Sequence, residues 1–236
     1  MNGLFVTGTD TGVGKTVLTG GIACALRARG HAVGVAKPVQ SGALAGDPYG
    51  DAQLLKRWTR VGESPGELAP FSFSAPLAPS IAAELEGRVV DRDEAVAHVR
   101  AIASRYDAVL VEGAGGLLVP LGQDWTVADL ALDLALPVLV VARAGLGTVN
   151  HSALTVRVAR QLGLEPIGVI LNGPADDSTP ANARLIERLA GVPVLGHTPP
   201  LDGELTGERL GRLVEDNVDV DALAGVAIRS REVAHV

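Results

Sequence analysis

Short apolar runs recur along the chain, and each is followed by a turn and a stretch with helical periodicity. The apolar residues within a run are continuous rather than alternating, as in strands that are buried on both faces of a parallel sheet. The runs cover residues 4–7, 32–36, 108–111, 138–142, 167–171 and 192–195. We therefore expect a central, mostly parallel sheet.

Helices are predicted between these runs, over residues 15–29, 52–60, 92–105, 127–135, 149–162 and 180–190, with a last one around 208–213. Alternation of strands and helices is typical of α/β proteins with right-handed crossovers, so the predicted fold is an α/β three-layer sandwich. We expect residues 1–226 to form a single domain and residues 227–236 a frayed tail. Residues 42–79 have the least regular pattern and are expected to form loops beside the site.

A glycine-rich turn follows the first predicted strand and opens the first predicted helix, where residues 8–16 read GTDTGVGKT. This is the context of a phosphate-binding loop, in which backbone N–H groups and a lysine face the phosphates and the next hydroxyl reaches Mg²⁺. Thr9 stands where the usual pattern has glycine, and Gly8 lies one residue further back. An incidental glycine-rich turn is the alternative. The expected nucleotide-binding residues are Thr9, Asp10, Thr11, Gly12, Val13, Gly14, Lys15, Thr16 and Val17.

Two further apolar runs end in charged residues. Lys37 follows the run at 32–36, on a strand expected to lie beside the first strand, and Glu112 follows the run at 108–111. Ligands of open α/β sheets bind at the carboxyl ends of strands. Lysine suits anionic oxygens, and a carboxylate near a phosphate loop suits Mg²⁺. A capping role is the alternative for each residue.

A metal site needs a second carboxylate, and both Asp47 and Asp51 lie in the irregular segment. Asp51 opens a predicted helix, so it is alternatively an N-cap. The five histidines show no ligand spacing, and no nucleophile and base stand in a recognisable arrangement. Any chemistry is therefore expected to be phosphoryl transfer by positioning and charge stabilisation.

A fourth glycine-containing turn, residues 145–151 with the sequence GLGTVNH, follows the run at 138–142 and opens a helix. Exposed N–H groups at such a start can bind a carboxylate. An ordinary turn is the alternative, and His151 is interpreted as a structural hydrogen-bonding residue rather than a metal ligand.

Composition narrows the function class. The 236 residues carry a net charge of −7, which argues against a nucleic-acid partner. One cysteine, Cys24, rules out an internal disulfide and fits a reducing compartment. No signal peptide and no apolar stretch of ~18–20 residues is visible, so we expect a cytoplasmic protein without a membrane partner.

Four blocks, taken together, resemble the dethiobiotin synthetase family. They are VTGTDTGVGKT from Val6, KPVQSG from Lys37, VEGAGGLLVPL from Val111 and LGTVNH from Leu146. They stand in the family's order and cover nearly the whole chain, and the longer loop spacing is also the family's habit. The resemblance implies an ATP-dependent cyclo-ligase. Such an enzyme converts 7,8-diaminononanoate and CO₂ to dethiobiotin through a carbamate and a carbamic–phosphoric anhydride.

The resemblance also implies roles for particular residues. Mg²⁺ would be held by Thr16, Asp51 and Glu112. The charge that builds up on the carbamate and the γ-phosphate would be offset by Lys15 and Lys37. The carbamate and the substrate amines would be oriented by Ser41 and Thr11. Asn172 would contact adenine, with Pro199 in the base-binding loop.

For the other substrate, the resemblance implies contacts to its near end and alkyl chain from Ser41, Gly115, Leu117, Leu118 and Val119. Its distant carboxylate would be bound by Leu146, Gly147, Thr148 and Asn150 of a second subunit in a homodimer.

Two alternatives remain at this point. One is a nucleotide-switch ATPase like ParA or MinD, although residues 8–10 lack the second lysine of that class. The other is an amidotransferase-type synthase that shares the ATPase core. Such synthases carry a catalytic cysteine, whereas Cys24 falls inside the first predicted helix and is expected to be core.

Overall fold

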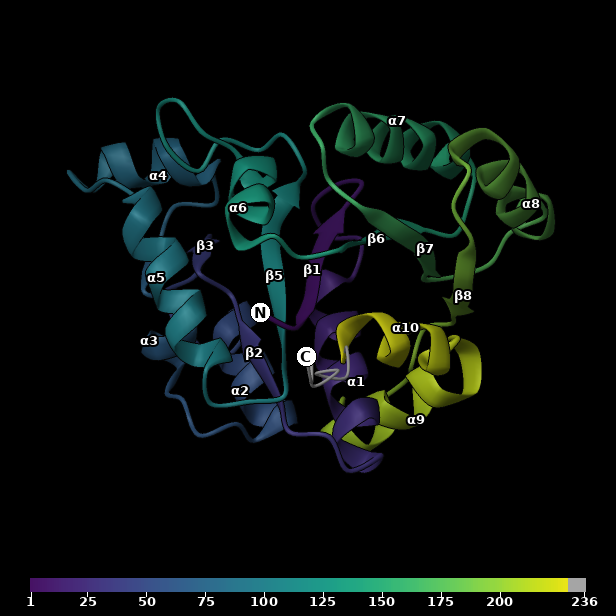
Figure 1. The fold of residues 1–236 in the computed structure, drawn as a ribbon, viewed down its shortest axis with the longest axis horizontal. Helices are drawn as coiled ribbons and strands as arrows, with labels where there is room; N and C mark the ends of the chain where they lie inside the picture. Colours follow the sequence, from purple (N-terminus) through teal and green to yellow (C-terminus); the bar gives the residue numbers. More distant parts are fainter. Residues whose placement is uncertain (229–236) are drawn as a thin grey trace, which may run out of the picture.

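The central sheet is built from six parallel strands in the order β2-β5-β1-β6-β7-β8 (Figure 1). A computed structural model describes residues 1–228. The strands are β1 (Gly3–Gly8), β2 (Val33–Ala36), β5 (Ala108–Gly116), β6 (Val138–Arg143), β7 (Pro166–Asn172) and β8 (Val194–Thr198). The predicted α/β fold with a mostly parallel central sheet is confirmed.

Helices cover both faces of this sheet. One layer contains α1 (Lys15–Ala28), α2 (Asp51–Thr59), α9 (Gly207–Asn217) and α10 (Val220–Ala227). The other contains α5 (Arg92–Ala103), α6 (Val127–Leu134), α7 (Thr148–Gln161) and α8 (Thr179–Ala190). Figure 1 shows α9 and α10 beside α1, and α7 beside α8. The chain moves one way along the sheet from β1 to β2 and the other way from β2 through β5 to β8, so right-handed crossovers put α1 on one face and α5 to α8 on the other. α2, α9 and α10 pack beside α1.

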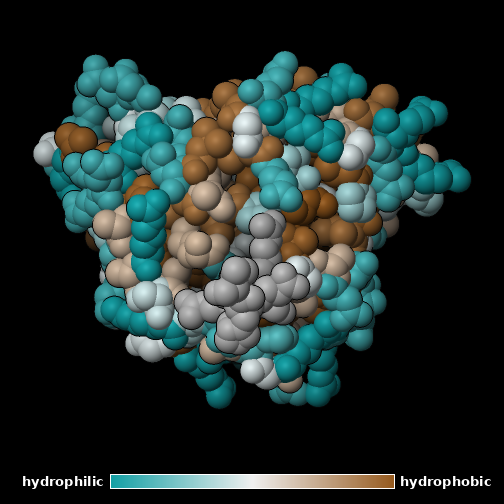
Figure 2. Space-filling view, in the orientation of Figure 1, coloured by the Kyte–Doolittle hydropathy of each residue, from teal (hydrophilic) through white to brown (hydrophobic). Residues whose placement is uncertain are grey.

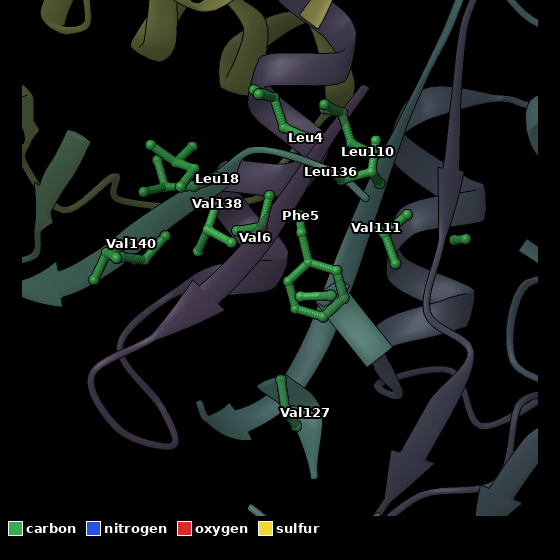
Figure 3. Close-up of a cluster of buried hydrophobic side chains, with 14 of the residues drawn as sticks. Leu4, Phe5, Val6, Leu18, Leu110, Val111, Val127, Leu136, Val138 and Val140 are labelled. Carbon is green, nitrogen blue, oxygen red and sulfur yellow. The ribbon is translucent and has the colours of Figure 1, made fainter. Parts of the chain in front are cut away.

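Aliphatic side chains fill the interior. Leu4, Phe5 and Val6 of β1 are fully buried, and they lie between Leu110 of β5 and Val138 of β6 (Figure 3). Since aromatics make up only 3% of the chain, branched aliphatic residues supply most of the apolar area. The core therefore fixes the carboxyl ends of β1 and β5 next to each other, which is where the phosphate loop and Glu112 stand.

Several elements differ from the sequence-based expectation. β5 lies between β1 and β2, so the strand before Lys37 is not the neighbour of the first strand. The segment at 42–79 is more ordered than expected. It adds α3 (Pro65–Leu68) and the start of α4 (Pro79–Leu85), and β4 (Phe71–Phe73) within it pairs with β3 (Val39–Ser41). Strands of three residues are too short to show a period.

The C-terminal boundary also differs. α10 was not predicted, and its last residue, Ala227, is fully buried, so the helix passes the expected domain limit at 226. The rest of the expected tail, residues 229–236, lies outside the described residues. Within residues 1–228 no helix combines the length and apolarity that a membrane crossing requires.

Candidate active site at the carboxyl ends of β1, β2 and β5

A pocket of about 1060 Å³ is lined by residues that follow β1, β2 and β5. It brings together predicted site residues that are far apart in the sequence. These are Thr11, Gly12, Gly14, Lys15, Thr16, Val17, Lys37, Ser41, Asp51, Glu112 and Gly115. One pocket therefore joins the phosphate loop to the lysine and to both carboxylates.

The phosphate loop is held by contacts from neighbouring strands. Gly14 has φ +96°, and a Cβ there would lie 2.1 Å from Nδ2 of Asn172, so only glycine fits. Asn172 Nδ2 donates to the carbonyl of Val13 at 2.9 Å, and Thr198 donates to Asn172 Oδ1 at 2.8 Å. The structure thus places Asn172 against the loop, where it supports the backbone.

Asp10 and Lys15 close the loop on its other side. Asp10 accepts from the Thr11 N–H at 2.7 Å and pairs with Arg143 of β6 at 2.8 Å. The Lys15 ammonium donates to the Asp10 carbonyl at 3.0 Å. This neutral carbonyl is the only partner of Lys15 that is recorded among the described residues, so its charge is available to an entering phosphate.

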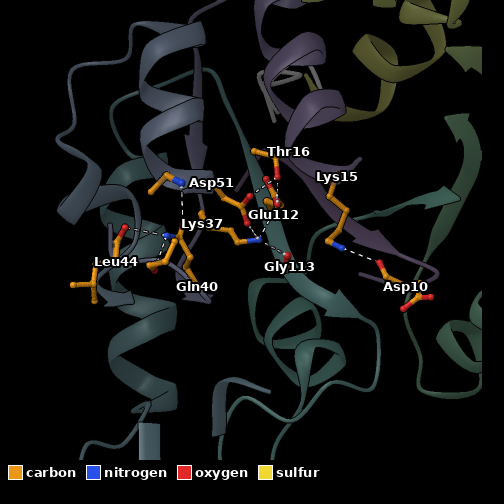
Figure 4. A network of polar contacts seen from close by, with 11 residues as sticks. Asp10, Lys15, Thr16, Lys37, Gln40, Leu44, Asp51, Glu112 and Gly113 are labelled. Carbon is orange, nitrogen blue, oxygen red and sulfur yellow. Dashed lines mark hydrogen bonds and ion pairs between the residues drawn. The ribbon is translucent and has the colours of Figure 1, made fainter. Parts of the chain in front are cut away.

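Lys37 lies at the centre of a buried cluster (Figure 4). Its ammonium donates to Glu112 Oε1 at 2.7 Å, to Asp51 Oδ2 at 2.8 Å and to the Gly113 carbonyl at 2.9 Å. The Lys37 side chain is 3% exposed and that of Glu112 is 1% exposed. Three acceptors thus satisfy the three hydrogens of the ammonium group, and its position is fixed.

The charges of this cluster set its protonation. Burial works against the charged form of Lys37, but Glu112 and Asp51 outweigh it and raise the pKa of Lys37 to about 12. Burial works against the Asp51 carboxylate too, yet Lys37 and Thr16 hold the pKa of Asp51 below its ordinary value. Burial and the nearby Asp51 charge raise the pKa of Glu112 despite Lys37. Lys37 is therefore a permanent cation.

The oxygens of Thr16, Asp51 and Glu112 fit a magnesium ion. The Thr16 hydroxyl lies 2.8 Å from Asp51 Oδ1 and 2.9 Å from Glu112 Oε1, although its single hydrogen can serve only one of them. Glu112 Oε2 is buried without a hydrogen-bond partner. These converging, under-satisfied oxygens are the hard ligands that Mg²⁺ prefers. Asp51 is the first residue of α2 and not its N-cap, whereas Asp47 caps a turn through the Tyr49 N–H.

Other predicted contacts lie elsewhere. Leu117 points into the core at 5% exposure and Leu118 is 57% exposed, so neither lines the pocket within one chain. Val119, the third residue expected along the alkyl chain, does line it. Thr9 and Pro199 also lie outside its lining, and the hydroxyl of Thr9 is buried without a partner.

The turn before α7 lies at a separate site. Leu146, Gly147 and Asn150 line a second hollow of about 530 Å³ between α7 and α8. Thr148 is fully buried, and its N–H donates to the Gly145 carbonyl at 3.3 Å. The Leu146 N–H already donates to Asp176 at 3.0 Å. Within one chain, this turn and Lys37 do not share a pocket.

Sequence reasoning missed several residues of the main pocket. They are Gln40, Tyr49, Leu54, Arg57, Trp58, Ala114, Pro120, Glu204, Leu205 and the run from Pro76 to Pro79. Gln40 stands inside the KPVQSG block and could have been noticed there. Ala114 and Pro120 likewise stand inside the VEGAGGLLVPL block. Leu54, Arg57 and Trp58 belong to the helix predicted at 52–60, and the rest come from irregular segments, where no local signal points to a pocket.

Comparison with known proteins points to one family. A family model described as an AAA domain matches residues 2–209. The ATP-dependent dethiobiotin synthetase BioD of Bacillus licheniformis is 46% identical over 228 residues, which cover 94% of this chain and 96% of that protein. The protein of the same name from Anaeromyxobacter dehalogenans is 55% identical over 193 residues, which cover 80% of this chain and 86% of that protein.

Solved structures agree on the fold. A ParA family ATPase from Chlorobium tepidum TLS superposes with a TM-score of 0.53 at 15% identity, covering 97% of this chain and 98% of that one. Chloroplast FtsY from Physcomitrella patens superposes with a TM-score of 0.52 at 20% identity, covering 94% of this chain and 64% of that one. Such low identity supports the shared fold alone, so a switch ATPase gains no further support.

The protonation of Lys15 generates a prediction. Burial foremost, and then the charge of Lys37, lowers the pKa of Lys15 to about 8. Above that pH the free protein loses the positive charge that meets the phosphates. We expect the affinity for a nucleoside triphosphate to fall by about tenfold per pH unit above pH 8, in titration calorimetry. Lys15→Arg, which stays charged, should move the decline to higher pH. An affinity that is flat through pH 9 would refute this role.

Proposed function

The chain belongs to the dethiobiotin synthetase family, and we propose that it is the ATP-dependent ligase that makes dethiobiotin from 7,8-diaminononanoate and CO₂. One observation carries the proposal beyond family membership. A buried lysine, paired with two carboxylates, opens into the same pocket as a phosphate-binding loop. Nucleotide hydrolysis alone does not require this second cation beside the loop.

The reaction proceeds in three steps. One amine of the substrate attacks CO₂ and loses a proton, giving a carbamate. A carbamate oxygen then attacks the γ-phosphorus of ATP, and ADP leaves. Finally the second amine attacks the carbonyl carbon and loses a proton, phosphate leaves with the C–O bond electrons, and the ureido ring closes. Every step creates or moves negative charge on oxygen, so fixed positive charge is the main catalytic requirement.

The two lysines supply that charge. Lys15 would release the Asp10 carbonyl and bind the β- and γ-phosphates, and Lys37 would face the carbamate and the transferred phosphoryl group. Thr16, Asp51 and Glu112 would hold Mg²⁺, whose charge offsets that of the phosphates. A cation at these carboxylates would compete with the Lys37 ammonium and so favour its contact with substrate oxygen.

Thr11 and Ser41 would orient the reacting end of the diamine. Both line the pocket. A Cβ added at Gly115 would lie 3.3 Å from Thr11 Oγ1, so glycine at this position keeps the space beside the Thr11 hydroxyl open. Leu77 and Val119 give the same pocket an apolar wall that suits an alkyl chain. Holding both amines near the carbonyl carbon is worth ~7–11 kcal/mol of barrier in well-oriented systems.

We propose that the substrate carboxylate is bound by a second copy of the chain. Leu146–Asn150 and Lys37 open into different pockets of one subunit. In a dimer, the turn at Leu146–Asn150 of one subunit would complete the Lys37 pocket of the other. Leu118, Leu146 and Leu154 are 57%, 83% and 55% exposed. Figure 2 shows apolar residues reaching the surface between hydrophilic ones over the upper middle of the molecule. A homodimer would cover such surface.

A cytoplasmic location belongs to the same proposal. It rests on the single free cysteine, Cys24, which suits a reducing compartment.

Replacing Lys37 tests the function. Lys37→Ala would leave Glu112 buried without its counter-charge and without the hydrogen bond from Lys37, at a cost of about 3–5 kcal/mol in stability. Lys37→Gln also removes the charge but keeps two N–H donors, so it is the better variant. We expect Lys37→Gln to lower diamine-dependent phosphate release at least ~100-fold while the affinity for ATP changes little. Product mass identifies the added carbonyl.

Lys56→Gln is the matched control, because within residues 1–228 Lys56 donates only to the carbonyls of Val61 and Gly62, just after α2. It should keep the parent rate. If phosphate release by the parent protein did not depend on the diamine, the ligase assignment itself would be wrong.

Mixing two defective variants tests the shared site. Asn150→Asp places a negative charge where the substrate carboxylate is expected and should raise the KM for the diamine. Lys37→Gln is defective in chemistry. Heterodimers contain one site free of both changes, so co-expression should restore turnover at low diamine concentration. A mixture no more active than its two components would contradict the shared site.

A further inference from the structure

Helix α2 begins without a cap from its own sequence. Its N-cap is Gly50, which has no side chain to accept from the first-turn N–H groups. An exposed helix start commonly uses a serine, threonine, asparagine or aspartate for this purpose. The omission matters because Asp51, the first residue of α2, is the carboxylate that pairs with Lys37.

The missing acceptor comes from β3. Gln40 Oε1 accepts from the Ala52 N–H at 2.9 Å, which is the second N–H of α2 (Figure 4). Gln40 Nε2 donates to the carbonyls of Ala43 at 2.9 Å and Leu44 at 3.3 Å. Only this orientation of the amide pairs each donor with an acceptor. Gln40 is 2% exposed, so these bonds are shielded from water.

Gly50 is shaped for this arrangement. A Cβ at Gly50 would lie 2.8 Å from Gln40 Nε2 and 3.2 Å from the Leu44 carbonyl. A residue with its own capping side chain therefore cannot stand at position 50 while Gln40 occupies the space. Gly50 and Gln40 thus form a complementary pair, in which glycine admits a cap from another element.

Gln40 also anchors the segment that leads into α2. Leu44, whose carbonyl Gln40 holds, accepts from the Asp47 N–H at 2.9 Å, and Asp47 accepts from the Gly50 N–H at 3.0 Å. This chain of bonds runs from Gln40 through the turn to the residue before Asp51. Both ends of the turn at 43–52 are thereby tied to one buried amide.

We infer that Gln40 is a positioning residue that caps α2 from β3 and so sets the Asp51 carboxylate against Thr16 and Lys37. The inference rests on the proposed function only in that Asp51 is taken to serve the magnesium ion. Gln40 lines the pocket, but its recorded hydrogen bonds occupy its oxygen and both amide hydrogens, which leaves no hydrogen for a substrate. It acts through Asp51 and is not a catalytic residue.

Two substitutions separate its two contacts. Gln40→Met keeps the length of the side chain and removes every hydrogen bond. Gln40→Glu keeps an acceptor for the Ala52 N–H and removes the donors to Ala43 and Leu44. Gln161→Met, at the exposed end of α7, is the matched control. Hydrogen exchange of the metal-free protein over residues 43–54 reports on the turn and cap directly, and Mn²⁺ binding in the presence of ADP reports on Asp51.

In Gln40→Met, we expect exchange at Asp47, Gly50 and Ala52 to quicken roughly tenfold, and Mn²⁺ to bind roughly tenfold more weakly. In Gln40→Glu, exchange at Asp47 and Gly50 should quicken while Ala52 stays protected. Unchanged exchange in Gln40→Met, with the β1 and β5 amides still protected, would overturn the inference. If Gln40→Met does not fold, loss of protection at Ala52 in Gln40→Glu would overturn it instead.

These outcomes are independent of the ligase assay. A parent protein without diamine-dependent turnover would refute the proposed function and leave the exchange pattern intact. Normal exchange in the variants of an active ligase would refute the role of Gln40 alone.

Discussion

The buried ammonium group of Lys37, held between Asp51 and Glu112, is the interaction on which the site depends. A charge taken out of water is tolerated only when it is paired and hydrogen-bonded. β2, β5 and α2 must therefore meet at one point, since each contributes one member of the cluster. They are brought there by the aliphatic core between β1 and β5 and by the cap that Gln40 of β3 provides to α2.

The same cluster explains the electrostatics of the pocket. Lys37 is balanced by its two carboxylates, whereas Lys15 faces a neutral carbonyl and carries the lowered pKa. The chain has a net charge of −7, yet Lys15 offers a positive charge without a carboxylate partner at the phosphate loop, because local placement and not total charge decides binding. Metal binding at Asp51 and Glu112 would then free Lys37 for the substrate.

The sequence predicted those parts of the site that end a buried strand. Glu112 and the phosphate loop follow continuous apolar runs, and parallel strands bring their carboxyl ends to one edge. Lateral order is not encoded locally, so the placement of β5 between β1 and β2 was missed. The cap that Gln40 provides to α2 was missed for the same reason, because Gln40 and Ala52 meet only in the folded chain. Leu117 and Leu118 were predicted to contact the alkyl chain, but Leu117 packs in the core and Leu118 is exposed, so neither lines the pocket.

A crystal structure with a non-hydrolysable ATP analogue, Mg²⁺ and the diamine tests the central claim most directly. The account predicts a metal ion bound to the oxygens of Thr16, Asp51 and Glu112, with the Lys37 ammonium turned toward the γ-phosphate and the reacting amines. A metal ion bound away from Asp51 and Glu112, or a Lys37 that contacts only those carboxylates in the full complex, would contradict it.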